Sequence, residues 1–397
     1  MKATSLPTST GSGPSNGPTG PPPFDFAPLN RVVFEAGGLA RLGELARELG
    51  GTRALLVTDP GLEEAGHPQR AADSLRGAGL AVAVFDGVEE NPTERHVQAG
   101  AAAARRHQAD ILVAVGGGSA MDVCKGTNFI ATNGGRMPDY RGFGRATKPM
   151  LPSIGVPTTA GTGSEAQSYA LIADEVTHLK MACGDRKVAF RVALLDPEVT
   201  LTQPTMVTAV TGLDSVTHAL ESFVTAKRSA MSMMFARQAW RMLSANFEQV
   251  LEAPSDLMSR SAMQLGAHLA GAAIETSMLG CAHSCANPLT AHYGIVHGIA
   301  VGVMLPHVIR FNAAYVGPLY ADLAREAALP GGDADALARR VTSFLSAAGL
   351  PTTLADLGVS RSILPLLAEE ASQQWTARFN PRPVTEADLL RLYEAAL

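Results

Sequence analysis

The sequence contains few aromatic residues and no excess of basic ones. Phe, Trp and Tyr make up 5% of the 397 residues, and 32 Lys and Arg are outnumbered by 37 Asp and Glu, which leaves a net charge of −5. A nucleic-acid-binding surface needs a basic patch, and single strands need exposed aromatic rings on which their bases stack. The composition therefore argues against nucleic acid as a partner.

Cysteines and long apolar runs are also scarce. Four cysteines scattered through a long chain are typical of a reduced intracellular protein and not of a disulfide framework. No uninterrupted apolar run reaches the roughly 18 residues of a membrane-spanning helix. Residues 1–28 are rich in Pro, Gly, Ser and Thr and lack the apolar centre of a signal peptide. These features predict a cytoplasmic protein with no membrane segment and with a disordered leader at 1–28.

The remaining chain is long enough for two domains, and its 46% hydrophobic residues can bury a large core. In the first half, short apolar runs alternate with amphipathic segments, a pattern that predicts βαβ units and a parallel sheet. The expected strands are 31–34, 54–59, 81–85, 111–115 and 153–157. After Asp196, stretches rich in Ala, Leu and Met predict helices only, and we expect breaks between them at Pro254, Pro288, Pro306, Pro318 and Pro330. We therefore expect a dinucleotide-binding α/β domain at 29–200 and an all-helical, metal-binding domain at 201–397.

A glycine-rich loop ends one of the expected strands. Residues 109–119 read ADILVAVGGGS, and a helical pattern follows them. Glycines let the backbone approach a pyrophosphate, and the N-terminus of the following helix offers free N–H groups. The arrangement favours a dinucleotide site, although the same residues also make an ordinary turn. Their spacing differs from the Rossmann G-x-G-x-x-G, so a Rossmann fold is not implied.

Two further polar features follow expected strands. The segment TTAGTGSE at 158–165 offers hydroxyls and small residues to a phosphate or a ribose, and it equally suits a helix N-cap. Asp59 ends the strand 54–59. A carboxylate there can accept a hydrogen bond from the ribose 2′-hydroxyl and repel a 2′-phosphate, which favours NAD over NADP. Asp is also a common turn residue.

Six of the ten histidines fall between residues 218 and 307. Asp214 and His218 are four residues apart in a helical pattern, which leaves their side chains about 40° apart on one face. Such a pair can share a metal ion or form an ordinary contact within a helix. His283 and His297 are fourteen residues apart, roughly 21 Å along one straight helix. If both bind one ion, the chain must turn back between them, for which Pro288 and Gly294 are suited.

Taken together, these motifs resemble the iron-containing (group III) alcohol dehydrogenase family. The resemblance covers about residues 30–315. It rests on VTD at 57–59, NPT at 91–93, GGGSAMD at 116–122, PTTAGTGSE at 157–165, GLDSVTHALES at 212–222 and LPHVIRFN at 305–312. It implies an α/β domain with a dehydroquinate synthase-like parallel sheet, an all-helical metal-binding domain, and an active site in the cleft between them.

The resemblance also implies the site residues and the reaction. One divalent ion per chain, Fe²⁺ or Zn²⁺, would be bound by Asp214, His218, His283 and His297. The cofactor NAD would be bound by Asp59, Asn91, Gly117, Gly118, Ser119, Asp122, Thr158, Thr159, Thr162 and Lys180. The reaction would be hydride transfer between a small alcohol or aldehyde and the nicotinamide, with the metal as Lewis acid. We also expect a homo-oligomer, a dimer or larger.

The sequence departs from the family pattern in two places. The family usually has a second histidine four residues after the third metal ligand, at a position on the proton path. Here that position is Asn287, which cannot titrate. Ile274 and Glu275 stand where residues of the substrate pocket are expected. The metal ligands are therefore complete, while the pocket and the proton route differ.

Other functions stay open at this point. A dehydroquinate synthase-like lyase would need a basic phosphate pocket in the helical domain, but residues 268–300 contain no Lys or Arg. A maleylacetate reductase-type relative is a second alternative. A third is a metal-binding relative that has lost turnover, against which the presence of both cofactor loops and all four ligands argues.

Overall fold

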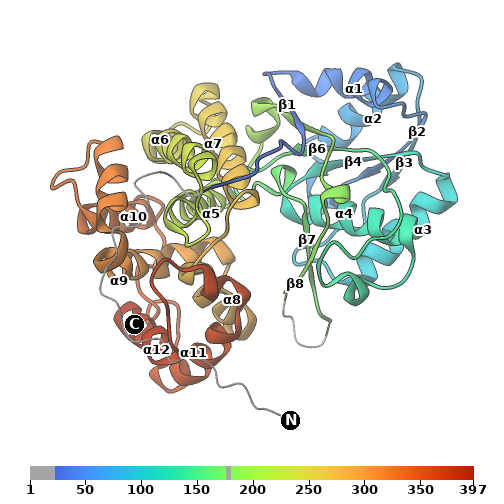
Figure 1. The fold of residues 1–397 in the computed structure, drawn as a ribbon. Helices are drawn as coiled ribbons and strands as arrows, with labels where there is room; N and C mark the ends of the chain where they lie inside the picture. Colours follow the sequence, from blue (N-terminus) through green and yellow to red (C-terminus); the bar gives the residue numbers. More distant parts are fainter. Residues whose placement is uncertain (1–22, 176–179) are drawn as a thin grey trace, which may run out of the picture.

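The computed structural model describes residues 23–175 and 180–397, which form a sheet half and a helical half (Figure 1). The sheet half is built on six parallel strands in the order β1-β9-β6-β4-β2-β3. Their bounds are β1 Arg31–Phe34, β2 Arg53–Val57, β3 Ala81–Phe85, β4 Ile111–Gly116, β6 Ser153–Pro157 and β9 Val192–Leu195. The helices among these strands are α1 Leu42–Glu48, α2 His67–Gly77, α3 Glu94–His107 and α4 Gly118–Asn133.

Helices cover both faces of the large sheet. Leu42 of α1 and Leu75 of α2 belong to the core on one face, and Ala104 of α3 and Met121 of α4 belong to the core on the other. Every residue of β4 and β6 is buried for this reason. Strands buried on both faces read as continuous apolar runs, which explains why these two were easy to predict.

A second, smaller sheet contains β5 Gly142–Phe143, β8 Lys180–Gly184 and β7 Tyr169–Ala173 in that order. β7 and β8 are antiparallel, and β5 runs parallel to β8. The small sheet packs on α4 through β7. It contributes side chains to the cleft described below.

The helical half contains α5 Thr205–Val224, α6 Ala230–Glu252, α7 Leu257–Glu275, α8 Cys281–Tyr293, α9 His297–Glu326, α10 Ala334–Ala347, α11 Leu364–Gln373 and α12 Glu386–Ala396. α5 lies at its centre, in contact with α6, α7 and α9. It is buried at every residue from Gly212 to Val224, including Asp214, His218 and Glu221. Buried polar side chains are costly unless they are paired, so their presence on this helix marks a site.

One described helix, α9, is long and apolar enough to cross a membrane by length and composition. However, 61% of its most apolar window is buried inside the protein, as in the core helix of a globular protein. Its regular geometry is interrupted at Val316, with φ −130°, two residues before Pro318. A proline at this point removes a helical hydrogen bond and favours a kink.

The predicted fold class is confirmed, with an N-terminal parallel sheet and C-terminal helices. The predicted strands 31–34, 81–85 and 153–157 have the bounds of β1, β3 and β6. The strands β5, β7, β8 and β9 were not predicted. β5 and β9 have only two and four residues, and β7 and β8 form an antiparallel pair outside the main βαβ repeat.

The prediction that prolines break the helical stretches is wrong for Pro288 and Pro306, which lie inside α8 and α9. Residues 1–22 of the predicted leader lie outside the described residues. Of the rest of that segment, Phe26 packs on Phe235 of α6, with ring centroids 5.9 Å apart. This part of the predicted leader is therefore in contact with the helical half.

Candidate active site

Three of the predicted cofactor-binding segments meet at the carboxyl ends of neighbouring strands. Asp59 follows β2, residues 117–119 follow β4, and residues 158–162 follow β6. These strands are adjacent, in the order β6-β4-β2. Ligands of open α/β sheets bind outside this edge. The fold thus brings together three motifs that are separate in the sequence.

The loop at 116–119, here called the glycine loop, packs against the loop at 158–165, here called the threonine loop. A Cβ added to Gly118 would lie 2.7 Å from Cγ2 of Thr162, and one added to Gly117 would lie 3.4 Å from Cγ2 of Thr159. A larger residue at 118 would therefore push the loops apart. α4 begins at Gly118, so its free N–H groups and the positive end of its dipole lie at this point. The arrangement fits a diphosphate.

Asp122 and Lys125 on α4 hold the threonine loop in place. Asp122 accepts a 3.0 Å hydrogen bond from the hydroxyl of Ser164, and burial raises the pKa of this carboxyl to about 6. Lys125 is buried, and its Nζ donates to the carbonyl oxygens of Ser164 and Tyr169 at 2.6 and 2.8 Å. Asp122 therefore has a structural partner as well as its predicted contact with the cofactor, which stays a prediction.

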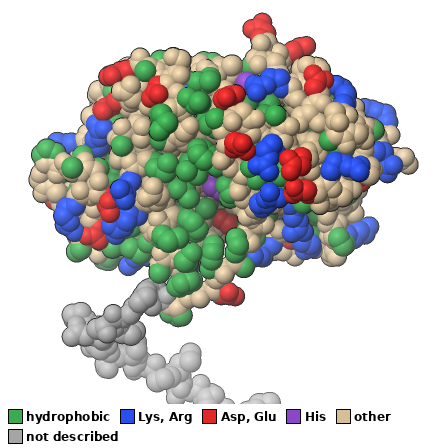
Figure 2. All heavy atoms as spheres, turned by 90° about the horizontal axis from the view of Figure 1, so that it is seen from above, with side chains coloured by type: hydrophobic (Ala, Val, Ile, Leu, Met, Phe, Trp, Pro, Cys, Tyr) green, Lys and Arg blue, Asp and Glu red, His purple; other side chains and the backbone are tan. Residues whose placement is uncertain are grey.

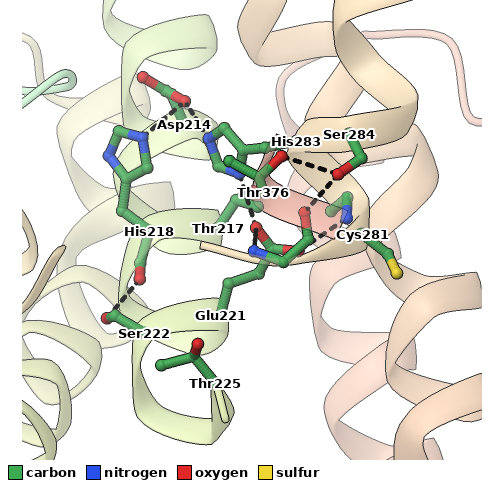
Figure 3. Close-up of polar contacts among 12 residues, drawn as sticks. Asp214, Thr217, His218, Glu221, Ser222, Thr225, Cys281, His283, Ser284 and Thr376 are labelled. Carbon is green, nitrogen blue, oxygen red and sulfur yellow. Dashed lines mark hydrogen bonds and ion pairs between the residues drawn. The ribbon is translucent and has the colours of Figure 1, made fainter. Parts of the chain in front are cut away.

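The four predicted metal ligands lie around one carboxylate oxygen. Oδ1 of Asp214 is 3.2 Å from Nε2 of His218 and 3.5 Å from Nε2 of His283 (Figure 3). It is 3.8 Å from Nε2 of His297. Ligand atoms at about 2.1 Å around a tetrahedral ion are roughly 3.4 Å apart. The ligand atoms of Asp214, His283 and His297 all lie within 4.8 Å of one another. These three groups therefore have the spacing that a single divalent ion requires, and His218 lies beside the carboxylate of Asp214.

The chain turns back between the last two histidines at Gly294. α8 ends there, with a φ of +64° that glycine tolerates, and His297 begins α9 three residues later. The rings of His283 and His297 are consequently 5.4 Å apart, although fourteen residues separate them. This is the reversal that a shared ion requires.

The chemistry of the donor atoms fits a cation. Oδ1 of Asp214 and Nε2 of His283 are buried without a hydrogen-bond partner among the described residues. Such atoms are rare in folded proteins, and a cation would satisfy both. Burial lowers the pKa of His218 to about 4, which leaves its imidazole neutral and able to coordinate. Burial would also lower the pKa of His283, but the carboxylates of Asp214 and Glu221 raise it to about 9. The site thus favours positive charge.

The predicted metal ligands lie beside a cavity of about 810 Å³ between the two halves. His297 and Asn287 line it from the helical half, and Asn91 and Lys180 line it from the sheet half. Two predicted cofactor residues therefore share one cavity with a predicted metal ligand.

Comparison with known proteins identifies the family. A model of the iron-containing alcohol dehydrogenases matches residues 29–197, and a model of the C-terminal part of the Fe-containing alcohol dehydrogenase family matches residues 208–397. This chain belongs to the iron-containing alcohol dehydrogenases. The family predicted from the motifs is confirmed.

Individual members of the family are similar over nearly the full length. The 1,3-propanediol dehydrogenase of Klebsiella pneumoniae is 35% identical, over 94% of this chain and 98% of its own. The NAD-dependent methanol dehydrogenase of Bacillus methanolicus is 32% identical, over 92% and 97%. A crystal structure of 1,3-propanediol oxidoreductase has a TM-score of 0.91 at 34% identity and covers 95% of this chain and 100% of its own.

In this iron-containing alcohol dehydrogenase, one residue beside the predicted metal ligands was not predicted from the sequence. Glu221 on α5 is buried, and its carboxylate accepts hydrogen bonds from Nδ1 of His283 at 2.7 Å and from the backbone N–H groups of Ala282 and Gly280 at 2.6 and 3.0 Å (Figure 3). It directs Nε2 of His283 towards Asp214 and satisfies free N–H groups at the start of α8. The available signal was its spacing, seven residues after Asp214 and so on the same helix face.

The two departures from the family pattern lie at different places. Asn287 lines the cavity, and its Nδ2 donates to Oε1 of Gln374 at 3.0 Å. Glu275 is directed elsewhere, since its carboxylate accepts hydrogen bonds from the N–H and the hydroxyl of Ser168 at 2.9 and 2.7 Å. Neither Glu275 nor Ile274 is among the described residues that line the cavity, and their expected effect on the substrate pocket stays a prediction.

The threonine loop is attached to the helical half along one face of α7. A Cβ added to Gly271 would lie 2.5 Å from the carbonyl oxygen of Gly163, so loop and helix touch there. Glu165 pairs with His268 at 3.0 Å, in agreement with a structural role for this histidine. Since His268, Gly271 and Glu275 share one helix face, the loop is fixed relative to the metal-binding half.

The last part of the chain fixes α8. The hydroxyl of Tyr393 donates to the carbonyl oxygen of Cys285 at 2.7 Å, and the hydroxyls of Ser284 and Thr376 are 2.7 Å apart. The first turn of α8, which carries His283, is therefore held by Glu221 on one side and by the C-terminal segment on the other.

Proposed function

We propose that this chain is an NAD-linked, metal-dependent alcohol dehydrogenase and aldehyde reductase that acts on small alcohols by hydride transfer. One divalent ion per chain, Fe²⁺ or Zn²⁺, is bound by Asp214, His218, His283 and His297 of the segment 201–397, and NAD is bound by the segment 29–200. The observation that carries the proposal is the cavity in which His297 faces the cofactor residues Asn91 and Lys180.

A divalent ion at these four side chains supplies a Lewis acid to the reacting oxygen. NAD held at residues 117–119 and 158–162 would supply the acceptor or the donor of the hydride. The protein's own contribution is positioning. Glu221 accepts the hydrogen bond from Nδ1 of His283 and so keeps Nε2 of this ring directed towards Asp214.

The experiment is an anaerobic purification, a metal analysis and an assay of NADH absorbance with a panel of alcohols and aldehydes. Alcohol-dependent formation of NADH by metal-loaded protein supports the proposal, and no turnover on any alcohol or aldehyde would overturn it. A lyase would instead release phosphate from a phosphorylated sugar acid with no net change in NADH. A maleylacetate reductase would consume NADH with the unsaturated keto acid and oxidise no alcohol. A relative that has lost turnover would bind metal and NAD only.

Asp59 is expected to set the preference for NAD(H) over NADP(H). It lies at the end of β2. A Cβ added to Gly116 of the glycine loop would lie 3.1 Å from Oδ2 of Asp59, so the carboxylate is close to this loop. A 2′-phosphate beside this carboxylate would be repelled. Asp59→Gly should therefore raise kcat/KM for NADPH relative to NADH, whereas Asp86→Gly, after β3, should not. A wild-type kcat/KM that favours NADPH would contradict this role.

Asn287 is expected to slow alcohol oxidation near neutral pH. It occupies the proton-path position of the family and has no titratable group. Asn287→His should raise oxidation near pH 7 by up to about 10²-fold and introduce a titration between about pH 6 and 8. Gln374→Ala, which removes only the hydrogen-bond partner, should leave the pH profile unchanged. An unchanged profile in Asn287→His would remove this position from the proton path.

We further propose a cytoplasmic homo-oligomer, a dimer or larger, without a membrane segment or a nucleic-acid partner. β1 is an edge strand, and its Val32 and Phe34 side chains are 44% and 41% exposed. Elsewhere on the surface, Figure 2 shows hydrophobic side chains gathered in a band between charged flanks. Such a face is suited to association. A monomeric mass by light scattering would contradict the oligomer.

A further inference from the structure

A second set of residues lines the same cavity and has no part in the proposed hydride transfer. Phe143 and Tyr169 of the sheet half and Trp375 and Phe379 of the helical half all line it. Their rings form a continuous series, with centroids 5.6, 6.0 and 6.2 Å apart from one ring to the next. We call these four residues the aromatic band. It crosses the cleft and offers an apolar surface to a hydrocarbon chain.

Two arginines line the cavity from opposite walls. Arg141 directly precedes β5 in the sheet half, and Arg378 lies within the aromatic band of the helical half, between Trp375 and Phe379. Nε of Arg378 donates to the carbonyl oxygen of Trp375 at 3.1 Å, which fixes the guanidinium and leaves its terminal nitrogens to a ligand. In the described part of the chain, no carboxylate lies within ion-pair distance of either arginine.

The other titratable groups that line the cavity are already engaged. Lys180 is assigned to the cofactor and His297 to the metal, and Glu370 forms an ion pair with His292 at 2.8 Å. The diphosphate of NAD is accounted for by the N-terminus of α4. The cavity therefore has an excess of positive charge in a chain whose net charge is −5. Positive charge concentrated in a cleft attracts anionic substrates.

We propose that the cleft selects alcohols and aldehydes that carry a carboxylate at the end remote from the reacting carbon. The reacting end lies at the metal, the hydrocarbon chain lies on the aromatic band, and the carboxylate is bound by Arg141 and Arg378. A guanidinium binds a carboxylate through two parallel hydrogen bonds, which gives direction as well as charge. This inference rests on the proposed dehydrogenase function and names its substrate class.

The test compares aldehydes of equal length, with and without a carboxylate, in NADH-dependent reduction by metal-loaded enzyme. We expect a higher kcat/KM for 4-oxobutanoate than for butanal, and for 5-oxopentanoate than for pentanal, with a preference that falls as salt is added. Arg141→Gln and Arg378→Gln should each lower this preference about fivefold through the KM of the acid, while the values for butanal stay unchanged. Arg145→Gln is the matched control, since Arg145 is exposed near Arg141 but outside the cavity lining.

Succinate carries carboxylates but cannot react, so its inhibition provides a separate measurement. It should compete with the aldehyde in wild-type enzyme, and it should inhibit Arg141→Gln and Arg378→Gln more weakly. Equal or better use of butanal by wild type would overturn the inference and leave the dehydrogenase proposal standing. A raised KM for NADH in the variants, with the preference intact, would also overturn it, because the arginines would then serve the nucleotide. Absence of turnover with every aldehyde would instead overturn the proposed function.

Discussion

Replacement of His297 by alanine is expected to remove the metal ion and to abolish turnover while the fold is retained. His297 is the first residue of α9, and its side chain is 26% exposed, so its loss leaves no large cavity in the core. The site would keep three of its four ligands. Lewis-acid stabilisation of the reacting oxygen is worth several kcal/mol, so the rate should fall by about 10³-fold or more.

The measurements are metal content, circular dichroism and kcat on the same preparations. His292→Ala is the matched control, because His292 lies five residues earlier, at the end of α8, and pairs with Glu370 and not with Asp214. The control should keep its metal and its activity. Full activity in a His297→Ala protein shown to be free of metal would refute the assignment of the ligands.

The second large effect is expected at Glu221, which touches a ligand but not the ion. In Glu221→Gln, one carbonyl oxygen replaces two carboxylate oxygens, so either Nδ1 of His283 or the N–H of Ala282 faces an NH2 group and loses its acceptor. Where the NH2 group faces His283, the imidazole would carry its proton on Nε2, the atom that must coordinate. Partners of metal ligands typically contribute about 10–100-fold to metal affinity, and we expect a loss in that range. Glu221→Ala should also lower the stability of the metal-free protein, by about 1–3 kcal/mol for each buried N–H group left unpaired.

Chelator competition measures the metal affinity, and thermal unfolding of the metal-free protein separates the two effects. Glu252→Gln, at the exposed end of α6, is the control for loss of a carboxylate. If Glu221→Gln binds metal as tightly as wild type, the orientation of His283 does not depend on this hydrogen bond. If a Glu221 variant unfolds at a lower temperature but binds metal as tightly as wild type, Glu221 only stabilises the start of α8.

The sequence predicted the parts of the molecule that are local. Three features each lie within one short segment: the glycine loop, the threonine loop, and the pair Asp214 and His218. Spacing along the chain is enough to predict such local features. Glu221 was missed because its partner, His283, lies 62 residues away. The aromatic band and Arg378 were missed because these residues come from three separate segments, and only tertiary packing brings the segments together. Arg378 also lies beyond residue 315, where the motif resemblance ended.

The contacts between α8 and the C-terminal segment have a consequence for biosynthesis. Tyr393 and Thr376, which hold Cys285 and Ser284, lie 108 and 92 residues further along the chain. Translation delivers the sheet half first, and a domain generally folds as soon as it has left the ribosome. The glycine loop therefore meets Thr159 and Thr162 early in synthesis, whereas the helix that carries His283 meets Thr376 and Tyr393 only after 92 and 108 further residues have followed Ser284 and Cys285. The predicted nucleotide site can therefore form earlier on the growing chain than the predicted metal centre.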